Sequence, residues 1–121
     1  MNSNGYAEMQ RETLSGRALE REVFTRITAR LEAADIKQPG GATALATALG
    51  ENKRLWITLA IDLANPQNTC PDEIAAGLIS LAAFVESHTR AVIDGKASQS
   101  ILVEINKNII KGLTSEEAEA A

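Results

Sequence analysis

Residues 52–85 read NKRLWITLAIDLANPQNTCPDEIAAGLISLAAFV, and the pattern of this stretch decides the fold class. Apolar residues recur at steps of three and four on both sides of a short segment that contains two prolines. That period predicts two amphipathic helices. Pro66 forces Asn65 out of the helical region and ends the first helix, whereas Pro71 suits the first turn of the next. The stretch is therefore predicted to be a pair of helices joined by a tight turn.

The same period continues on both sides of this pair, so four helices are predicted in all. Each helix has one apolar stripe that a bundle core would bury. The four stripes are Leu19, Val23, Ile27, Leu31 and Ala34; Leu45, Leu49, Asn52, Trp56, Leu59 and Leu63; Ile74, Leu78, Leu81, Val85, His88 and Val92; and Leu102, Ile105, Ile109 and Leu113.

Short segments rich in glycine, proline and capping residues separate the predicted helices. KQPGG at residues 37–41 ends the first helix, and Asp94-Gly95 ends the third. Thr69, with Asp72 three residues on, fits a capping box at the start of the third helix, and Ser98 fits the N-cap of the fourth. Connections this short favour antiparallel neighbours. The predicted fold is an all-α bundle of four main helices.

Both ends of the chain are expected to lie outside the four helices. A small helical turn is predicted around residues 6–10. The tail TSEEAEAA, residues 114–121, is acidic and has no large apolar residue, so it is predicted to be disordered. The chain is accordingly divided into one helical domain, residues 1–113, and an acidic tail, residues 114–121.

Composition and charge exclude several classes of protein. The 121 residues suit one domain, and the net charge of −4 leaves no basic face for nucleic acid. Cys70 is the only cysteine, so no intrachain disulfide is expected. The amino terminus lacks a secretory signal, and the apolar runs are too short to span a bilayer. We expect a cytoplasmic protein that neither enters a membrane nor binds nucleic acid directly.

The sequence predicts no catalytic, metal-binding or cofactor-binding residue. Cys70 and His88 are the most reactive pair of residue types, but 18 positions of mostly continuous helix separate them. At the helical rise per residue, this separation amounts to roughly 25 Å. One cysteine and one histidine cannot supply the ligands of a zinc site, and Gly40-Gly41 lacks the spacing of a phosphate-binding loop. The chain is not expected to be an enzyme.

Some apolar residues lie off the main stripes of the two central helices. They are Leu55, Ile57 and Ile61 in the second helix and Ile79, Phe84 and Ile93 in the third. A helix that is apolar on more than one side is either central in the bundle or presents a face to a partner. Both interpretations remain open from the residues alone, which indicate a helical interaction module.

Residues 54–85 resemble the FlaF family of flagellar biosynthesis proteins from alphaproteobacteria. The matching positions are Arg54, Leu55, Trp56, Asp62, Pro66, Asn68, Pro71, Leu78, Ile79, Ser80 and Phe84. The last helix also matches through Ile105, Ile109, Gly112 and Leu113, and Tyr6 fits the start of the family pattern. Two departures are Cys70, where the family usually has leucine, and Ala75-Ala76, where it tends to have an arginine.

The resemblance implies a non-enzymatic regulator of flagellum biosynthesis. Such a protein is expected to act in the cytoplasm as a flagellin-binding secretion chaperone that couples flagellin synthesis to export. Flagellin is the implied partner, and an FlbT-like regulator is a second one. Two other functions remain open. One is direct binding of flagellin messenger RNA, which would use Lys53, Arg54 and the arginines of the first helix, and the other is a structural role in the flagellum.

Six residues are predicted to contact a partner, and three are predicted to shape the turn. The partner-binding candidates are Arg54, Leu55, Trp56, Asp62, Ile79 and Phe84, and the turn residues are Pro66, Asn68 and Pro71. For Trp56, packing in the bundle is the first interpretation and exposure in a flagellin-binding groove is the second. In the first interpretation the indole N–H is expected to bond to Asn52, one turn earlier.

Overall fold

The computed structural model describes residues 20–120, with side chains from residue 20 to residue 113. Within this range the regular structure consists of four helices, which confirms the predicted all-α class. They are a first helix, described over residues 20–33, then α2 (Gly41–Ala64), α3 (Asp72–Ile93) and α4 (Ser100–Ala120). The turn predicted around residues 6–10, and Leu19 of the first stripe, lie outside the described residues.

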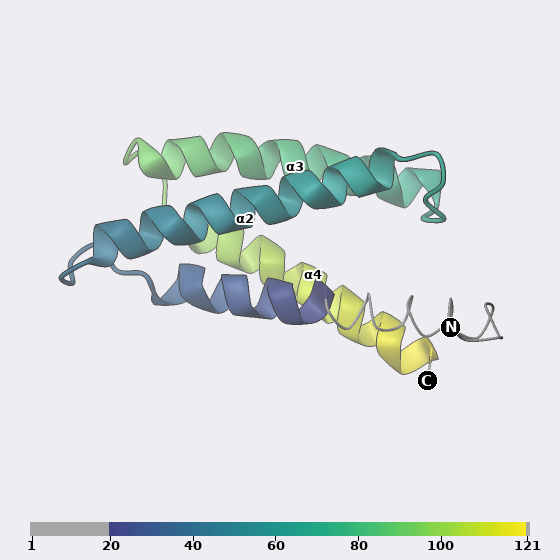
Figure 1. Cartoon of the computed structure of the whole chain (residues 1–121), viewed down its shortest axis with the longest axis horizontal. Helices are drawn as coiled ribbons and strands as arrows, with labels where there is room; N and C mark the ends of the chain where they lie inside the picture. Colours follow the sequence, from purple (N-terminus) through teal and green to yellow (C-terminus); the bar gives the residue numbers. More distant parts are fainter. Residues whose placement is uncertain (1–19, 121) are drawn as a thin grey trace, which may run out of the picture.

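Consecutive helices run in opposite directions, as the short connections predict (Figure 1). The helices α2 and α3 pack side by side in one layer, and the first helix and α4 lie on the other side of the core. The C-terminal half of α4 runs obliquely away from α2 and α3 (Figure 1). The two layers are therefore closest near the start of α4 and separate toward the turn between α2 and α3.

The core is built almost entirely from aliphatic side chains and one aromatic pair. Its fully covered members come from all four helices and are Phe24, Leu31, Ala48, Leu49, Trp56, Ala82, Val85, Val92, Leu102 and Val103. In the first helix Ile27, Leu31 and Ala34 are buried as predicted, but Phe24 takes the buried position predicted for Val23, which is only half-buried. The ring of Phe24 contacts Trp56 of α2.

The connection between the first helix and α2 depends on two adjacent glycines. Gly40 has a φ of 75°, in the left-handed region that glycine adopts without strain. At Gly41 the backbone passes so close to Asp35 that any Cβ would overlap the Asp35 carbonyl oxygen. The Asp35 carboxylate also accepts a hydrogen bond from the Lys37 N–H, at 2.9 Å, inside the same turn. The two glycines thus shape a tight joint between two helices.

The turn between α2 and α3 is held by asparagine side chains. Asn68 Oδ1 accepts a hydrogen bond from the Cys70 N–H at 2.8 Å, and Asn68 Nδ2 donates to Asp62 Oδ2 at 3.3 Å. The predicted capping box of Thr69 with Asp72 is wrong. Pro71 occupies the N-cap position of α3, and no side chain caps this end. Thr69 therefore lies two residues too early to serve as the N-cap.

The helix α4 begins as predicted but extends further than predicted. Ser98 Oγ accepts a hydrogen bond from the Ser100 N–H at 3.1 Å, which fits its expected capping role. The helix then continues through Ala120, so the disorder predicted for residues 114–121 is not confirmed. Alanine and glutamate are strong helix formers, and an existing helix extends into such residues at little cost.

Candidate protein-binding site

Trp56 lies in the core and anchors a chain of buried polar groups. Only 1% of its surface is exposed, and its ring meets Phe24 edge to face with a centroid distance of 5.7 Å. The indole N–H donates to Asn106 Oδ1 at 2.9 Å, and Asn106 Nδ2 donates to Asn52 Oδ1 at 2.7 Å. These contacts connect α2 with α4 across the interior of the bundle.

The direct partner of the indole is thus Asn106, and the expected partner Asn52 is one step further along the chain. Asn106 was not among the residues predicted to be buried, although it falls four residues after Leu102 on the buried face of α4. A polar residue at a position that the apolar stripe predicts to be buried was the signal in the sequence. The same signal had placed Asn52 in the stripe of the second helix. Both amides are fully buried.

An apolar cavity opens at the end of the bundle where the two layers separate. We call it the turn groove, because it borders the turn between α2 and α3. Its volume is about 590 Å³, and its lining comes from all four helices. The apolar lining residues are Phe24, Leu59, Leu63, Ile74, Leu78, Ile109 and Leu113, and the polar ones include Asp62, Asn68, Thr69 and Cys70.

The charged residues that line the turn groove are acidic. Asp62 and Glu20 are the two charged residues among the lining residues. Asp72 and Glu73 add two exposed carboxylates in the first turn of α3, next to the lining residues Pro71 and Ile74. The C-terminal end of α2 also carries the negative end of a helix dipole. The groove therefore combines an apolar lining with a negative rim.

The structure does not gather the six predicted partner-binding residues into one patch. Of the six, Asp62 lines the turn groove. Trp56 is buried, and Leu55 is half-buried against the core. Arg54 is exposed on α2, Ile79 is half-buried on α3, and Phe84 is 46% exposed and stacks on His88. Two of the three turn residues, Asn68 and Pro71, also line the groove, whereas Pro66 is exposed outside the lining.

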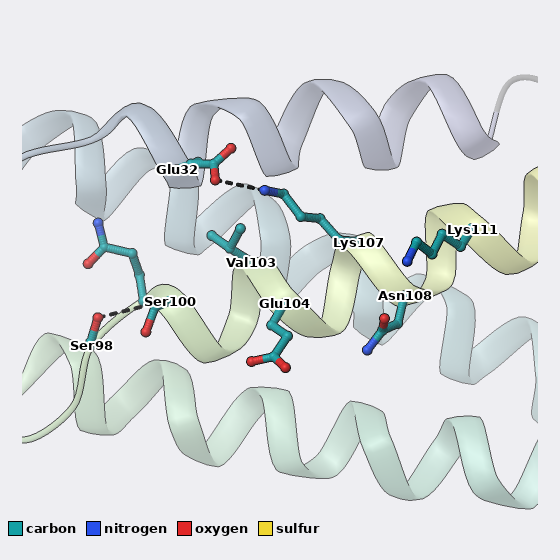
Figure 2. A pocket seen from close by; sticks show the side chains of 9 residues that line it. Glu32, Ser98, Ser100, Val103, Glu104, Lys107, Asn108 and Lys111 are labelled. Atoms are coloured by element: carbon teal, nitrogen blue, oxygen red, sulfur yellow. Dashed lines mark hydrogen bonds and ion pairs between the residues drawn. The ribbon is translucent and has the colours of Figure 1, made fainter.

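A second cavity, of about 620 Å³, lies along α4, and most of the residues that line it are polar or charged (Figure 2). Glu32 of the first helix and Lys107 of α4 form an ion pair across it at 2.8 Å, and both side chains are about half exposed. Gln99 Nε2 donates to the Ala34 carbonyl oxygen at 2.8 Å. These contacts hold the start of α4 against the first helix. Val103 is its single apolar lining residue, so the apolar surface of this cavity comes largely from the aliphatic parts of polar side chains and not from a stripe of apolar residues.

The described residues bring no catalytic or metal-binding cluster together. Within residues 20–120, no group of three or more potential metal ligands forms. Cys70 lies half-buried in the turn groove, whereas His88 Nε2 lies 3.0 Å from the Ser98 carbonyl oxygen at the start of α4. In the same part of the chain, no helix combines the length and the apolarity that crossing a membrane requires.

The fold and the turn groove define a class of protein, namely a small four-helix bundle with an apolar groove at one end. The family model for the flagellar protein FlaF matches residues 2–113, so the chain belongs to the FlaF family and is a flagellar protein. The comparisons with curated proteins and with solved structures found no match. The family match includes the described part of the first helix, the whole of α2 and α3, and α4 as far as Leu113.

The two departures from the family pattern differ in their surroundings. Cys70 lines the turn groove, so its side chain contributes to the groove surface. Ala75 is buried and Ala76 is exposed. A long charged side chain at position 76 would therefore extend directly into solvent, whereas one at position 75 would have to pass the surface of the bundle first.

Proposed function

We propose that this FlaF-family protein is a cytoplasmic, non-enzymatic chaperone that binds flagellin and couples flagellin synthesis to export. The observation that supports this function is the turn groove, an apolar cavity of about 590 Å³ in a flagellar protein. Grooves of this kind bind amphipathic helices by burying the apolar side of the helix. An export chaperone needs such a surface, because it holds a partner segment until the partner is released.

The expected strength of binding suits a reversible complex. Each leucine- or isoleucine-sized side chain that becomes fully buried contributes about 1.5–3 kcal/mol. Three or four such side chains contribute about 4.5–12 kcal/mol, and association costs at least about 4 kcal/mol, so burial of these side chains alone gives at best a micromolar dissociation constant. A chaperone that must release its cargo to the export apparatus requires affinity of this order.

An FlbT-like regulator is proposed as a second partner, which would link the flagellin-bound state to flagellin synthesis.

Direct binding of flagellin messenger RNA is the rival function, and the charges disfavour it. Arg54 is exposed and Lys53 is half-buried, but the net charge is −4 and the rim of the groove is acidic. Phosphates bind to clustered basic residues, and log affinity falls steeply with log salt concentration. The rival function therefore predicts RNA affinity that weakens with salt and depends on Lys53 and Arg54.

The test is to identify what the full-length protein binds. We expect purified monomeric flagellin to form a stoichiometric complex in isothermal titration calorimetry, and flagellin messenger RNA to give little heat. RNA binding without flagellin binding would refute the proposal in favour of the rival. Recovery of the protein in purified filaments or basal bodies, rather than in the cytoplasmic fraction, would indicate a structural component instead.

A further inference from the structure

The apolar stripes of α2, α3 and α4 become less buried at the same end of the bundle, near the turn between α2 and α3. On α2, Leu49 and Trp56 are fully buried, but Leu63, two turns beyond Trp56, is half-buried. On α4, Leu102 is fully buried and Leu113 is half-buried. On α3, which runs the other way, Val85 is fully buried, whereas Ile74 at its start is 55% exposed. Residues of the same apolar stripes that form the core therefore line the turn groove, where they are only partly buried.

The divergence of α4 explains this loss of cover. Its C-terminal half runs away from α2 and α3 (Figure 1), and the stripe residues at this end line a cavity. The helices that border the groove each present apolar residues with helical spacing. A further amphipathic helix could bind there by packing its apolar face between these stripes. The shape of the site thus points to a helix as the occupant.

The charges specify which kind of helix fits. The charged lining residues are acidic, and the first turn of α3 adds two more carboxylates beside the groove. Asp62 is exposed, and its carboxylate accepts only a long hydrogen bond of 3.3 Å from Asn68, which leaves room for a cation. A helix with acidic flanks would be repelled at this rim, whereas lysine or arginine beside an apolar face complements it.

We infer that the turn groove binds an amphipathic helix whose apolar face is flanked by lysine or arginine, with Ile74 contacting that face and Asp62 pairing with one cation. The inference rests on the proposed function for the identity of the partner, which makes the bound helix a segment of flagellin. It differs from the expectation for the sequence alone, because the binding surface lies at the end of the bundle and includes α4.

The first test uses full-length protein and purified monomeric flagellin. We expect Ile74→Glu to weaken binding by at least about tenfold, since it places a charge against the apolar face of the partner. Ile93→Glu is the matched control, because Ile93 is on the same helix, is 66% exposed and lies outside the groove lining. Ile74 is itself largely exposed, so both variants should keep the wild-type circular dichroism spectrum.

The rim is tested by charge reversal. We expect Asp62→Lys to weaken binding by about fivefold or more, the upper range for an exposed ion pair, and the loss should shrink at high salt. Asp94→Lys is the control, because it changes the net charge equally at the opposite end of α3. Equal effects of the two reversals would show that only net charge matters, and would refute the role of Asp62.

A second probe separates the groove from the identity of the partner. It is a pair of synthetic amphipathic peptides with the same leucine face, flanked either by lysines or by glutamates. The wild-type protein should bind the lysine peptide at least about tenfold more tightly, and Ile74→Glu should abolish the difference. If flagellin fails to bind and the lysine peptide binds through Ile74, the proposed function is wrong and the groove inference stands.

Three other outcomes would overturn the groove inference. One is flagellin binding that neither Ile74→Glu nor Asp62→Lys changes, which would leave the proposed function intact. Another is equal or absent binding of the two peptides. The third is capture, by a photo-crosslinker at position 74, of the chain's own residues 1–19 or of a second copy when flagellin is present.

Discussion

Replacement of Asn106 by alanine tests the buried polar chain most directly. The Asn106 side chain accepts from the Trp56 N–H and donates to Asn52 Oδ1, and all three residues are buried. Asn106→Ala removes both bonds and leaves the indole N–H and the Asn52 oxygen without partners. Each buried polar group left unpaired costs about 1–3 kcal/mol. The free energy of unfolding should therefore fall by about 2–6 kcal/mol, a large part of the roughly 5–15 kcal/mol typical of a domain.

A double-mutant cycle with Trp56→Phe separates the hydrogen bond from the packing. Phenylalanine keeps an aromatic ring but has no N–H, so in this background Asn106→Ala leaves only the Asn52 oxygen unpaired. Its cost should then be smaller by about 1–3 kcal/mol. The assay is urea denaturation followed by far-ultraviolet circular dichroism for the wild type, both single variants and the double variant.

The control for this cycle is Asn108→Ala, an exposed asparagine on the same helix. We expect it to change the free energy of unfolding by no more than about 0.5 kcal/mol. The reasoning would be refuted if the costs of Asn106→Ala and Trp56→Phe were additive within about 0.5 kcal/mol, since contacting residues in one hydrogen-bonded chain should couple.

Three further predictions concern stability. Gly41→Ala should destabilise the protein by at least about 3 kcal/mol in the same assay, because the Cβ would overlap the Asp35 carbonyl oxygen, whereas Gly50→Ala, with open space around its Cβ, should be neutral or stabilising. Trp56→Ala should cost about 3–5 kcal/mol, and the fluorescence of the folded wild type should be blue-shifted; red emission typical of a solvated indole would contradict its burial. Asn68→Ala should lower the melting temperature in a thermal scan through the loss of its turn bonds, each contributing about 1 kcal/mol; unchanged stability with lost flagellin binding would instead make Asn68 a contact residue.

The helices could be predicted from the sequence because local rules decide them. Apolar period and proline positions located α2, the turn and α3, and placed Trp56 on a buried face. The partner of its indole could not be predicted in this way. The period says which face of a helix is buried, but only the packing of α4 against α2 shows that Asn106 lies opposite. Long-range contacts of this kind have no signature within one helix.

The candidate site was less predictable than the fold, for a related reason. Ile74 belongs to a regular stripe, and the pattern predicted it to be core, yet the divergence of α4 leaves it exposed. The off-stripe residues drew attention to other faces of α2 and α3, whereas the groove is lined by stripe residues that lack cover. The angle between two helices depends on the side chains of several helices together, so it cannot be predicted from the residue pattern of one helix.

The buried amides also determine how the bundle can move. A displacement of α4 by one helical turn along its axis would separate Asn106 from both Trp56 and Asn52, and no other buried amide on α4 would replace it within the described side chains. Axial sliding is therefore costly, while tilting about Asn106 keeps the bonds intact. Asn106 would then act as a pivot for any tilt of α4, because Gln99 ties the start of the helix to the first helix while Ile109 and Leu113 line the groove at the other end.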